Sequence, residues 1–360
     1  MNPARFAALL ADYCLEVRAG QQVMVQSTTL AAPLLLALQR ALLERDAWPL
    51  IRPSLPEQEA GFWAAARDLH LDSFPSSALG EAERVDAFLR IDAPANTRAL
   101  AGVDPARLAR AARAAEPLRE ARLARRWCGT LWPTDAAAQQ AGMSTADFTA
   151  FVRRALFLDR DDPIAAWSSL SAAQARLIGR LSACSELRIE GEGTDLVLSV
   201  AGREWVNSDG RRNMPSGEVF TGPVETSAEG RIRYEIPTSP RGMEVAGIAL
   251  EFRAGVVVSG RADRGDDVLQ AMLATDDGAR RLGEIGIGTN FGVDRAIGST
   301  LVDEKMGGTV HLALGRSYPE TGGTNESAIH WDMICDLRRG GRLTADGEPI
   351  LVDGRFVQSD

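Results

Sequence analysis

The sequence is poor in the features that mark disulfide-stapled, membrane-spanning and nucleic-acid-binding proteins. Its 360 residues contain four widely spaced cysteines and no CxxC pair, so we expect reduced thiols. No apolar run approaches the roughly 20 residues of a membrane-spanning helix. The best candidate, residues 30–43, is interrupted by Gln39 and Arg40. The formal net charge of −9 argues against nucleic acid or an anionic membrane as the main partner.

Common catalytic motifs and an export signal are also missing. The sequence contains no P-loop, GxSxG or HExxH segment, so the enzyme classes that those motifs mark have no support. Residues 286–292 have GxGxxxG spacing rather than the GxGxxG of a dinucleotide loop, which favours a tight turn. The charged residues Arg5, Asp12, Glu16 and Arg18 do not fit a secretory signal, so we expect a cytoplasmic protein.

The chain has two halves with different patterns, which predict domains at residues 1–184 and 185–360. In the first half, short apolar runs alternate with helical spacing, which predicts an α/β domain with a mainly parallel sheet. The second half has short β-type runs separated by glycine, proline and aspartate, which predict a mostly antiparallel, α+β, β-rich domain. A long helix is expected at 105–126. Its arginines, three residues apart, predict a solvated face or a subunit contact.

Two histidines and three carboxylates in the second half form the inventory of a dinuclear metal site. They are Glu218, Glu284, His311, His330 and Asp332, and the last two project from one face of an extended chain. Carboxylates can bridge two divalent ions about 3.5–4 Å apart, while neutral imidazoles complete the coordination shells. On this pattern alone, the alternative stays open that His311 is a core histidine and that the carboxylates occupy surface turns.

Five sequence blocks resemble the thermophilic-type metalloaminopeptidases of the M29 peptidase family. Two lie in the first half, RWCGTLWPTDAAAQQAGMS and FLDRDDPIAAW, and three in the second, NMPSGEVFTGP, STLVDEKMGGTVHLALGRSYPET and NESAIHWDMICDL. The resemblance therefore covers nearly the whole chain. It implies metal ligands at Glu218, Glu284, His311, His330 and Asp332 and a catalytic tyrosine at Tyr318. We expect Glu218 to serve in catalysis as well.

The resemblance also implies how the protein is assembled and what it does. It implies a cytosolic homodimer with two divalent ions per subunit, Co²⁺, Zn²⁺ or Mg²⁺, that removes single N-terminal residues from peptides. We expect Glu284 to bridge the ions, Glu218 and Asp332 to complete one, and His311 and His330 the other. A candidate proton shuttle is Glu304, although a surface role is the more natural expectation for it.

Two other functions are compatible with the same sequence. A catalytically inactive binding or scaffold protein could keep this fold, but the loss of a ligand that would favour it is not seen. A metallohydrolase with the same metal chemistry could act on a different amide. The sequence therefore predicts a metalloaminopeptidase whose partners are peptides with a free N-terminus, and leaves these two alternatives open.

Overall fold

The computed structural model describes residues 1–357, with every side chain except that of Arg241, and it divides into two compact units. The first unit comprises Met1–Ile164 and Gly210–Pro215, and the second comprises Ala165–Asp209 and the chain from Ser216 onward. The division therefore falls near residue 164 instead of the expected 184. Helix α10 (Pro163–Leu181) accounts for the difference, because Leu177 and Leu181 pack in the core of the second unit.

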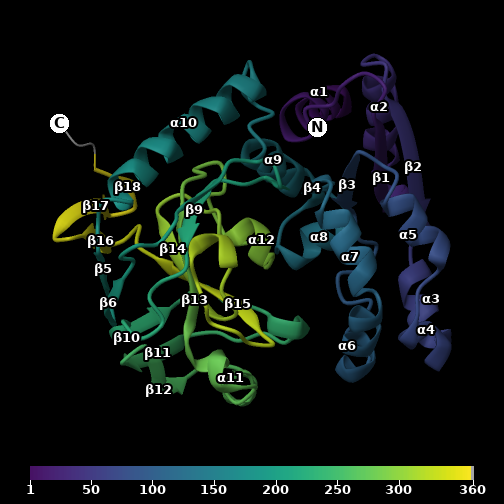
Figure 1. Cartoon of the computed structure of the whole chain (residues 1–360). Helices are drawn as coiled ribbons and strands as arrows, with labels where there is room; N and C mark the ends of the chain where they lie inside the picture. Colours follow the sequence, from purple (N-terminus) through teal and green to yellow (C-terminus); the bar gives the residue numbers. More distant parts are fainter. Residues whose placement is uncertain (358–360) are drawn as a thin grey trace. The chain divides into compact units, whose positions relative to one another are not determined.

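The first unit is built on a five-stranded parallel sheet with the order β2-β1-β3-β4-β8 (Figure 1). Every neighbouring pair of strands is parallel. The strands are β1 (Gln22–Thr28), β2 (Trp48–Ser54), β3 (Ala87–Asp92), β4 (Arg126–Leu131) and β8 (Asn213–Met214). Val23, Met24 and Val25 of β1 are all buried, as expected for a parallel strand that is covered on both faces. The predicted α/β domain with a parallel sheet is confirmed.

Helices cover this sheet, and α5 and α7 bring Ala82 and Leu118 against Met24 and Phe88. The helices of the unit are α1 (Pro3–Ala8), a π-helical turn (Leu9–Cys14), α2 (Ala32–Leu43), α3 (Gln58–Ala65), α4 (Asp68–Asp72), α5 (Ser76–Ala82), α6 (Pro105–Ala114), α7 (Glu116–Leu123), α8 (Asp135–Gln140) and α9 (Thr145–Ala155). The prediction of a single helix at 105–126 is wrong. Two helices, α6 and α7, stand there, because Pro117 is tolerated only in the first turn of a helix.

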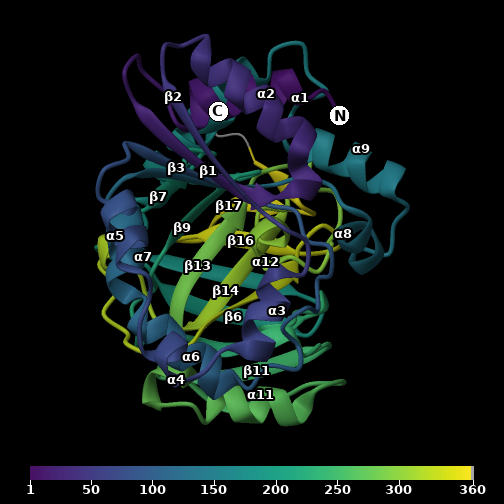
Figure 2. The same cartoon turned by 90° about the vertical axis from the view of Figure 1, so that its right-hand side faces the viewer.

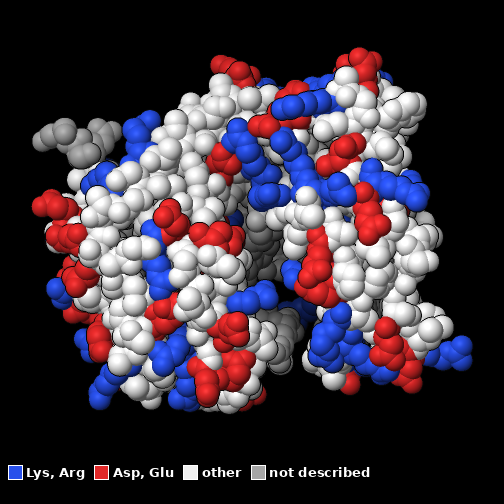
Figure 3. Space-filling model, in the orientation of Figure 1, with Lys and Arg blue, Asp and Glu red and all other residues white. Residues whose placement is uncertain are grey.

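Several arginines of α6 and α7 are paired within the first unit. Arg110 forms ion pairs with Asp68 and Asp72 of α4, and Arg119 pairs with Glu116 one turn away. On the face drawn in Figure 3, basic side chains likewise lie beside acidic ones. The expected arginine stripe is therefore partly neutralised by neighbouring carboxylates. Within residues 1–357, no helix combines the length and apolarity needed to cross a membrane.

The second unit contains two antiparallel sheets, as the pattern of short β runs predicts. One has the order β12-β11-β10-β6-β5-β16-β17-β18 and the other β15-β14-β13-β9-β7. Their strands are β5 (Glu186–Gly191), β6 (Thr194–Ser199), β7 (Val206–Ser208), β9 (Glu218–Thr221), β10 (Glu229–Tyr234), β11 (Ile248–Arg253), β12 (Val256–Arg261), β13 (Leu282–Gly288), β14 (Thr309–Gly315), β15 (His330–Asp336), β16 (Arg342–Ala345), β17 (Glu348–Val352) and β18 (Arg355–Phe356). Helices α11 (Asp266–Leu273) and α12 (Thr300–Asp303) complete the unit. One apolar core joins side chains of both sheets.

The register of the five-stranded sheet sorts its side chains onto an apolar and a polar face. Strands β13 and β14 run side by side in Figure 2, and Ile285, Leu312 and Met333 point into the core. On the opposite face Glu284 lies across from Ala313, which in turn lies across from Asp332. Because side chains alternate along a strand, residues two positions away share this polar face.

The absence of a side chain at Gly286 leaves room for the ring of His311 on the polar face. Gly286 lies across from His311, and a Cβ atom at residue 286 would lie 2.1 Å from His311 Cε1. The glycines of the 286–292 segment thus begin inside β13 rather than in a nucleotide-binding loop.

We expect Gly286→Ala to lower the free energy of unfolding by about 1–3 kcal/mol, because the added methyl group overpacks a fully buried site. Urea denaturation of the metal-free protein measures this change. The matched control is Gly61→Ala in α3, where a Cβ would meet nothing within 4 Å, and it should not be destabilised. Equal stability of Gly286→Ala and the wild type would contradict the close contact with His311.

Candidate metal centre

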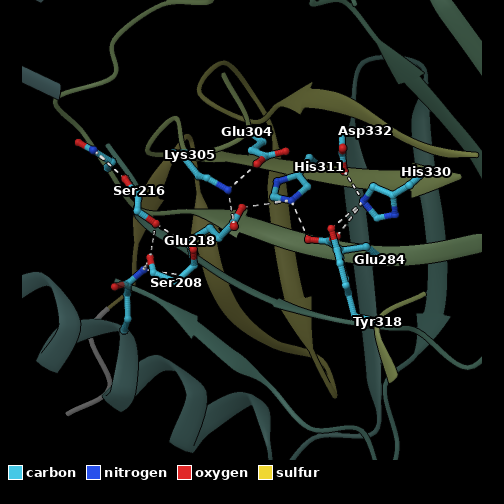
Figure 4. A network of polar contacts seen from close by, with 12 residues as sticks. Ser208, Ser216, Glu218, Glu284, Glu304, Lys305, His311, Tyr318, His330 and Asp332 are labelled. Atoms are coloured by element: carbon cyan, nitrogen blue, oxygen red, sulfur yellow. Dashed lines mark hydrogen bonds and ion pairs between the residues drawn. The ribbon is translucent and has the colours of Figure 1, made fainter. Parts of the chain in front are cut away.

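Four neighbouring strands bring the five predicted ligands together on the polar face (Figure 4). The ligands are Glu218 from β9, Glu284 from β13, His311 from β14, and His330 and Asp332 from β15. The first three are buried and the two on β15 are half-buried. The sequence separates these residues by more than a hundred positions, and only the register of the sheet explains their proximity.

Glu284 lies at the middle of this cluster. Its Oε1 lies 3.3 Å from His311 Nε2, and its Oε2 lies 3.2 Å from His330 Nε2. Glu218 Oε2 lies 3.4 Å from the same His311 nitrogen, and Asp332 Oδ1 lies 3.4 Å from the same His330 nitrogen. Each histidine therefore has a carboxylate partner of its own and shares Glu284 with the other.

The ligand atoms fall into two groups that share Glu284. Glu218, Glu284 and His311 offer atoms within 4.8 Å of one another, and so do Glu284, His330 and Asp332. The expected pairing of Glu218 with Asp332, and of one histidine with the other, is not the one that these distances favour. The position of Glu284 in both groups agrees with the expectation that it would contact both ions.

The chemistry of the donor atoms fits divalent cations. Glu218 Oε2, Asp332 Oδ1 and His311 Nδ1 are buried and have no hydrogen-bond partner, which is costly unless another group satisfies them. The carbonyl oxygen of Arg316 lies 2.7 Å from His330 Nδ1, so the ring can donate from Nδ1 and keep a lone pair on Nε2. Imidazole nitrogens with carboxylate oxygens are a common ligand set of zinc and related metals.

Lys305, which the sequence did not single out, is a further member of this cluster. Its side chain is buried, and its ammonium group pairs with Glu218 Oε1 and Glu304 Oε1 (Figure 4). Burial would lower the pKa of Lys305, but Glu218 and Glu304 raise it above its usual range, so the group stays charged. A lysine within a Glu-Lys-Met-Gly-Gly stretch carries no periodic or motif signal that predicts this role.

The structure does not place Glu304 at the surface, where it was expected. Its side chain is only 12% exposed, and its carboxylate lies within 4.8 Å of ligand atoms of His311 and Asp332. Burial raises the pKa of Glu304 to about 8 against the opposing effect of Lys305. The cluster thus contains a fourth carboxyl group that can hold a proton at neutral pH.

Tyr318 borders the cluster, as the resemblance implies. Its hydroxyl lies 3.5 Å from His330 Nε2, and its half-buried ring contacts the rings of His330 and Phe220 edge-on. Burial and the nearby carboxylates, Glu284 foremost, raise the pKa of Tyr318 above its usual range. The hydroxyl is therefore a hydrogen-bond donor throughout the neutral pH range.

Comparison with known proteins places the chain in a family. The thermophilic metalloprotease (M29) family matches residues 2–356. The chain belongs to this family. Aminopeptidase 2 of Geobacillus stearothermophilus is 31% identical over 98% of this chain and 97% of its own length. Aminopeptidase T of Thermus thermophilus is 34% identical over 55% of this chain and 56% of its own length. The resemblance drawn from the sequence blocks is confirmed.

Solved structures extend the M29 assignment to the fold. The structure of wild-type AmpT from Thermus thermophilus matches with a TM-score of 0.87 and 26% identity over 99% of both chains. A 2,5-dihydroxypyridine dioxygenase from Pseudomonas putida KT2440 matches with a TM-score of 0.59 and 15% identity over 99% of this chain and 97% of its own. At that identity only the fold is shared. The M29 fold therefore does not by itself fix the reaction.

The carboxylates of this M29 protein control the protonation of the metal-free cluster. Burial would lower the pKa of both histidines, but the neighbouring carboxylates outweigh this effect of burial. Glu284 and Glu218 raise the pKa of His311 to about 9, and Asp332 and Glu284 raise that of His330 to about 11. Burial would raise the pKa of Glu284, but the two histidines lower it to about 2. Without metal, protons on the histidines therefore balance the carboxylates at neutral pH.

We expect the metal-free M29 protein to lose stability as the pH rises from 6.5 to 9.5. Both histidines bind a proton more tightly in the folded chain, since their ordinary pKa is 6.5. Their contribution to stability is therefore complete below pH 6.5 and is lost as the pH passes through the folded values. Urea denaturation in the presence of a chelator, repeated across this range, measures the loss.

His330→Gln should flatten this pH dependence because it removes one of the two histidines whose pKa is raised. The matched control is His70→Gln in α4 of the first unit, outside the cluster, which should keep the wild-type slope. Equal slopes for His330→Gln and the wild type would show that the histidine–carboxylate contacts do not control stability.

Proposed function

We propose that this chain is a dinuclear metal-dependent aminopeptidase that hydrolyses single N-terminal residues from peptides. The observation that carries the proposal is the position of Glu284, which turns one carboxylate oxygen toward each of two histidine–carboxylate pairs. Membership of the M29 metalloproteases supports the hydrolytic class, and the names of its relatives support the exopeptidase activity.

The grouping of the ligands suggests how two divalent ions would be held. Glu218 and His311 would bind one ion, His330 and Asp332 would bind the other, and Glu284 would contact both. When bound, Co²⁺, Zn²⁺ or Mg²⁺ would lower the pKa of a water molecule and polarise the scissile carbonyl group. Glu218 belongs among the catalytic residues in this proposal because it would touch the cofactor directly.

Other side chains position these groups and handle charge and protons. Lys305 holds Glu218 Oε1, which leaves Oε2 turned toward His311. The protonated hydroxyl of Tyr318 would donate a hydrogen bond to the oxygen on which negative charge develops. Glu304, whose pKa is raised to about 8, is the carboxyl group that we propose to carry a proton to the leaving amine.

The substrate and the setting of the enzyme follow from the same proposal. A peptide with a free N-terminus would place its amine against a carboxylate or a metal at the centre, which limits cleavage to the first peptide bond. A homodimer in the cytoplasm stays our prediction, as does the absence of nucleic-acid and membrane partners. The inactive scaffold and the hydrolase of another amide are the rival functions that the first experiment separates.

Hydrolysis of aminoacyl-nitroanilides tests the proposal directly. We expect turnover of leucine p-nitroanilide, loss of turnover with a chelator, and recovery when Co²⁺ or Zn²⁺ is added back. The N-acetylated substrate is the control and should not be cleaved, because its amine is blocked. Absence of turnover across a panel of aminoacyl-nitroanilides after metal addition would favour a scaffold protein, and cleavage of the blocked substrate would favour another amide.

Tyr318→Phe tests the donor role of the hydroxyl, since it keeps the ring and removes only one oxygen. We expect kcat and kcat/KM to fall together by about 10²–10³-fold, because the lost hydrogen bond strengthens only as charge develops. Metal content should remain at the wild-type level. The matched control is Tyr234→Phe, whose buried hydroxyl lies in the core of the second unit, and it should retain activity. A kcat within a few-fold of the wild type for Tyr318→Phe would remove this residue from the mechanism.

A further inference from the structure

A cavity of about 580 Å³ lies in the first unit, and none of its lining residues belongs to the metal centre. Strands β1, β2 and β3 end at Thr28, Ser54 and Asp92, and all three residues line it. Strand order explains the position. The chain runs from β1 to β2 on one side and then crosses to β3 on the other side of β1. Where the strand order of a parallel sheet reverses in this way, a crevice that suits a ligand forms at the carboxyl ends.

The sheet face beneath the cavity changes from apolar to polar along the strands. Met24 and Phe88 belong to the apolar core at the start of this face. Two residues further along, Gln26 of β1 lies between Arg52 of β2 and Arg90 of β3 in one row across the sheet. Faces of parallel sheets are ordinarily apolar because helices cover them. A polar row under a cavity therefore indicates that a ligand, rather than a helix, packs on this face of the sheet.

Arg90 and Asp92 are the two charged side chains of β3 that line the cavity. They stand two residues apart on β3 and so share one face, and both line the cavity. In the part of the chain that the structure describes, neither side chain forms a hydrogen bond or an ion pair within 4 Å, whereas Arg52 pairs with Glu81. The guanidinium of Arg90 therefore faces the same space as the carboxylate of Asp92, and the carboxylates of Glu57 and Glu59 also line this cavity.

Two aromatic side chains line the same cavity as these charges. Phe62 and Trp63 of α3 line the cavity with their rings edge-on, 5.5 Å between centroids, and Phe62 is 45% exposed. Exposed aromatic rings beside a charged pair suit a ligand with an apolar part and two opposite charges. A simple anion would face the carboxylate of Asp92, and a simple cation would face the guanidinium of Arg90.

We propose that this cavity binds a free α-amino acid with an apolar side chain. Arg90 binds its carboxylate, Asp92 binds its ammonium group, and its side chain packs against Phe62 and Trp63. The site shares no residue with the metal centre, and the ligand is bound without chemical change.

Isothermal titration of the full-length, metal-loaded protein with L-phenylalanine tests the site. We expect saturable binding that weakens at least tenfold in Arg90→Gln and in Asp92→Asn, since each variant removes one charged hydrogen-bond partner. The matched control is Arg113→Gln, an exposed arginine of α6 outside the cavity, which should bind within twofold of the wild type. Melting curves check that the variants are folded, and either variant alone decides the outcome.

Two ligands that each lack one charge test the assignment of the contacts. 3-Phenylpropionate has no ammonium group and phenethylamine has no carboxylate, so both should bind at least tenfold more weakly than L-phenylalanine. His330→Gln, which alters the metal centre, should leave the binding of L-phenylalanine intact. The proposal is overturned if no saturable binding occurs or if a folded Arg90→Gln or Asp92→Asn variant binds like the wild type. It is also overturned if either single-charge ligand binds as tightly as L-phenylalanine, or if His330→Gln abolishes binding.

Discussion

The second unit is organised around the repulsion between carboxyl groups that the fold brings together in one small volume. Glu218, Glu284, Glu304 and Asp332 all lie close to one of the two histidines or to Lys305. Negative charges at such distances cannot remain buried unless cations or protons balance them. Lys305 supplies one fixed positive charge, and the histidines supply two more when they are protonated. Divalent ions would replace those protons, so we expect metal binding, protonation and stability to be linked in this protein.

The antiparallel sheet fixes the positions of these charged side chains relative to one another. The five candidate ligands lie on four hydrogen-bonded strands, with Glu218 and His330 at the first positions of β9 and β15. Their backbone positions are therefore fixed by ladders of hydrogen bonds rather than by loops. The alternation of side chains places Ile285 and Leu312 in the core and Glu284 and His311 on the other face. Tyr318 is the exception, because it follows the end of β14. The likeness to a dioxygenase at 15% identity shows that such a scaffold also occurs in a protein with another reaction, so the side chains on this face carry the specificity.

Much of this arrangement could be predicted from the sequence, and the remainder depended on contacts between distant segments. The alternation of strands and helices in the first half and the short β runs of the second predicted both kinds of sheet. The resemblance of the sequence blocks identified the five residues that the structure brings together. Their pairing could not be predicted, because it follows from the register that sets Glu284 opposite Ala313. The burial of Lys305 and Glu304 had no sequence signal, since a charged pair beside glycines is typical of a surface turn.

The short strand β8 ties the two units together through the order of the chain. The polypeptide leaves the first unit after Ile164, completes Ala165–Asp209, and returns to add Asn213–Met214 to the edge of the parallel sheet before it enters β9 at Glu218. A nascent chain therefore cannot finish its first sheet until the ribosome has also made the beginning of the second unit. Neither unit corresponds to one uninterrupted stretch of the gene. Exchange of either unit by recombination would require breaks after Ile164, Asp209 and Pro215 together.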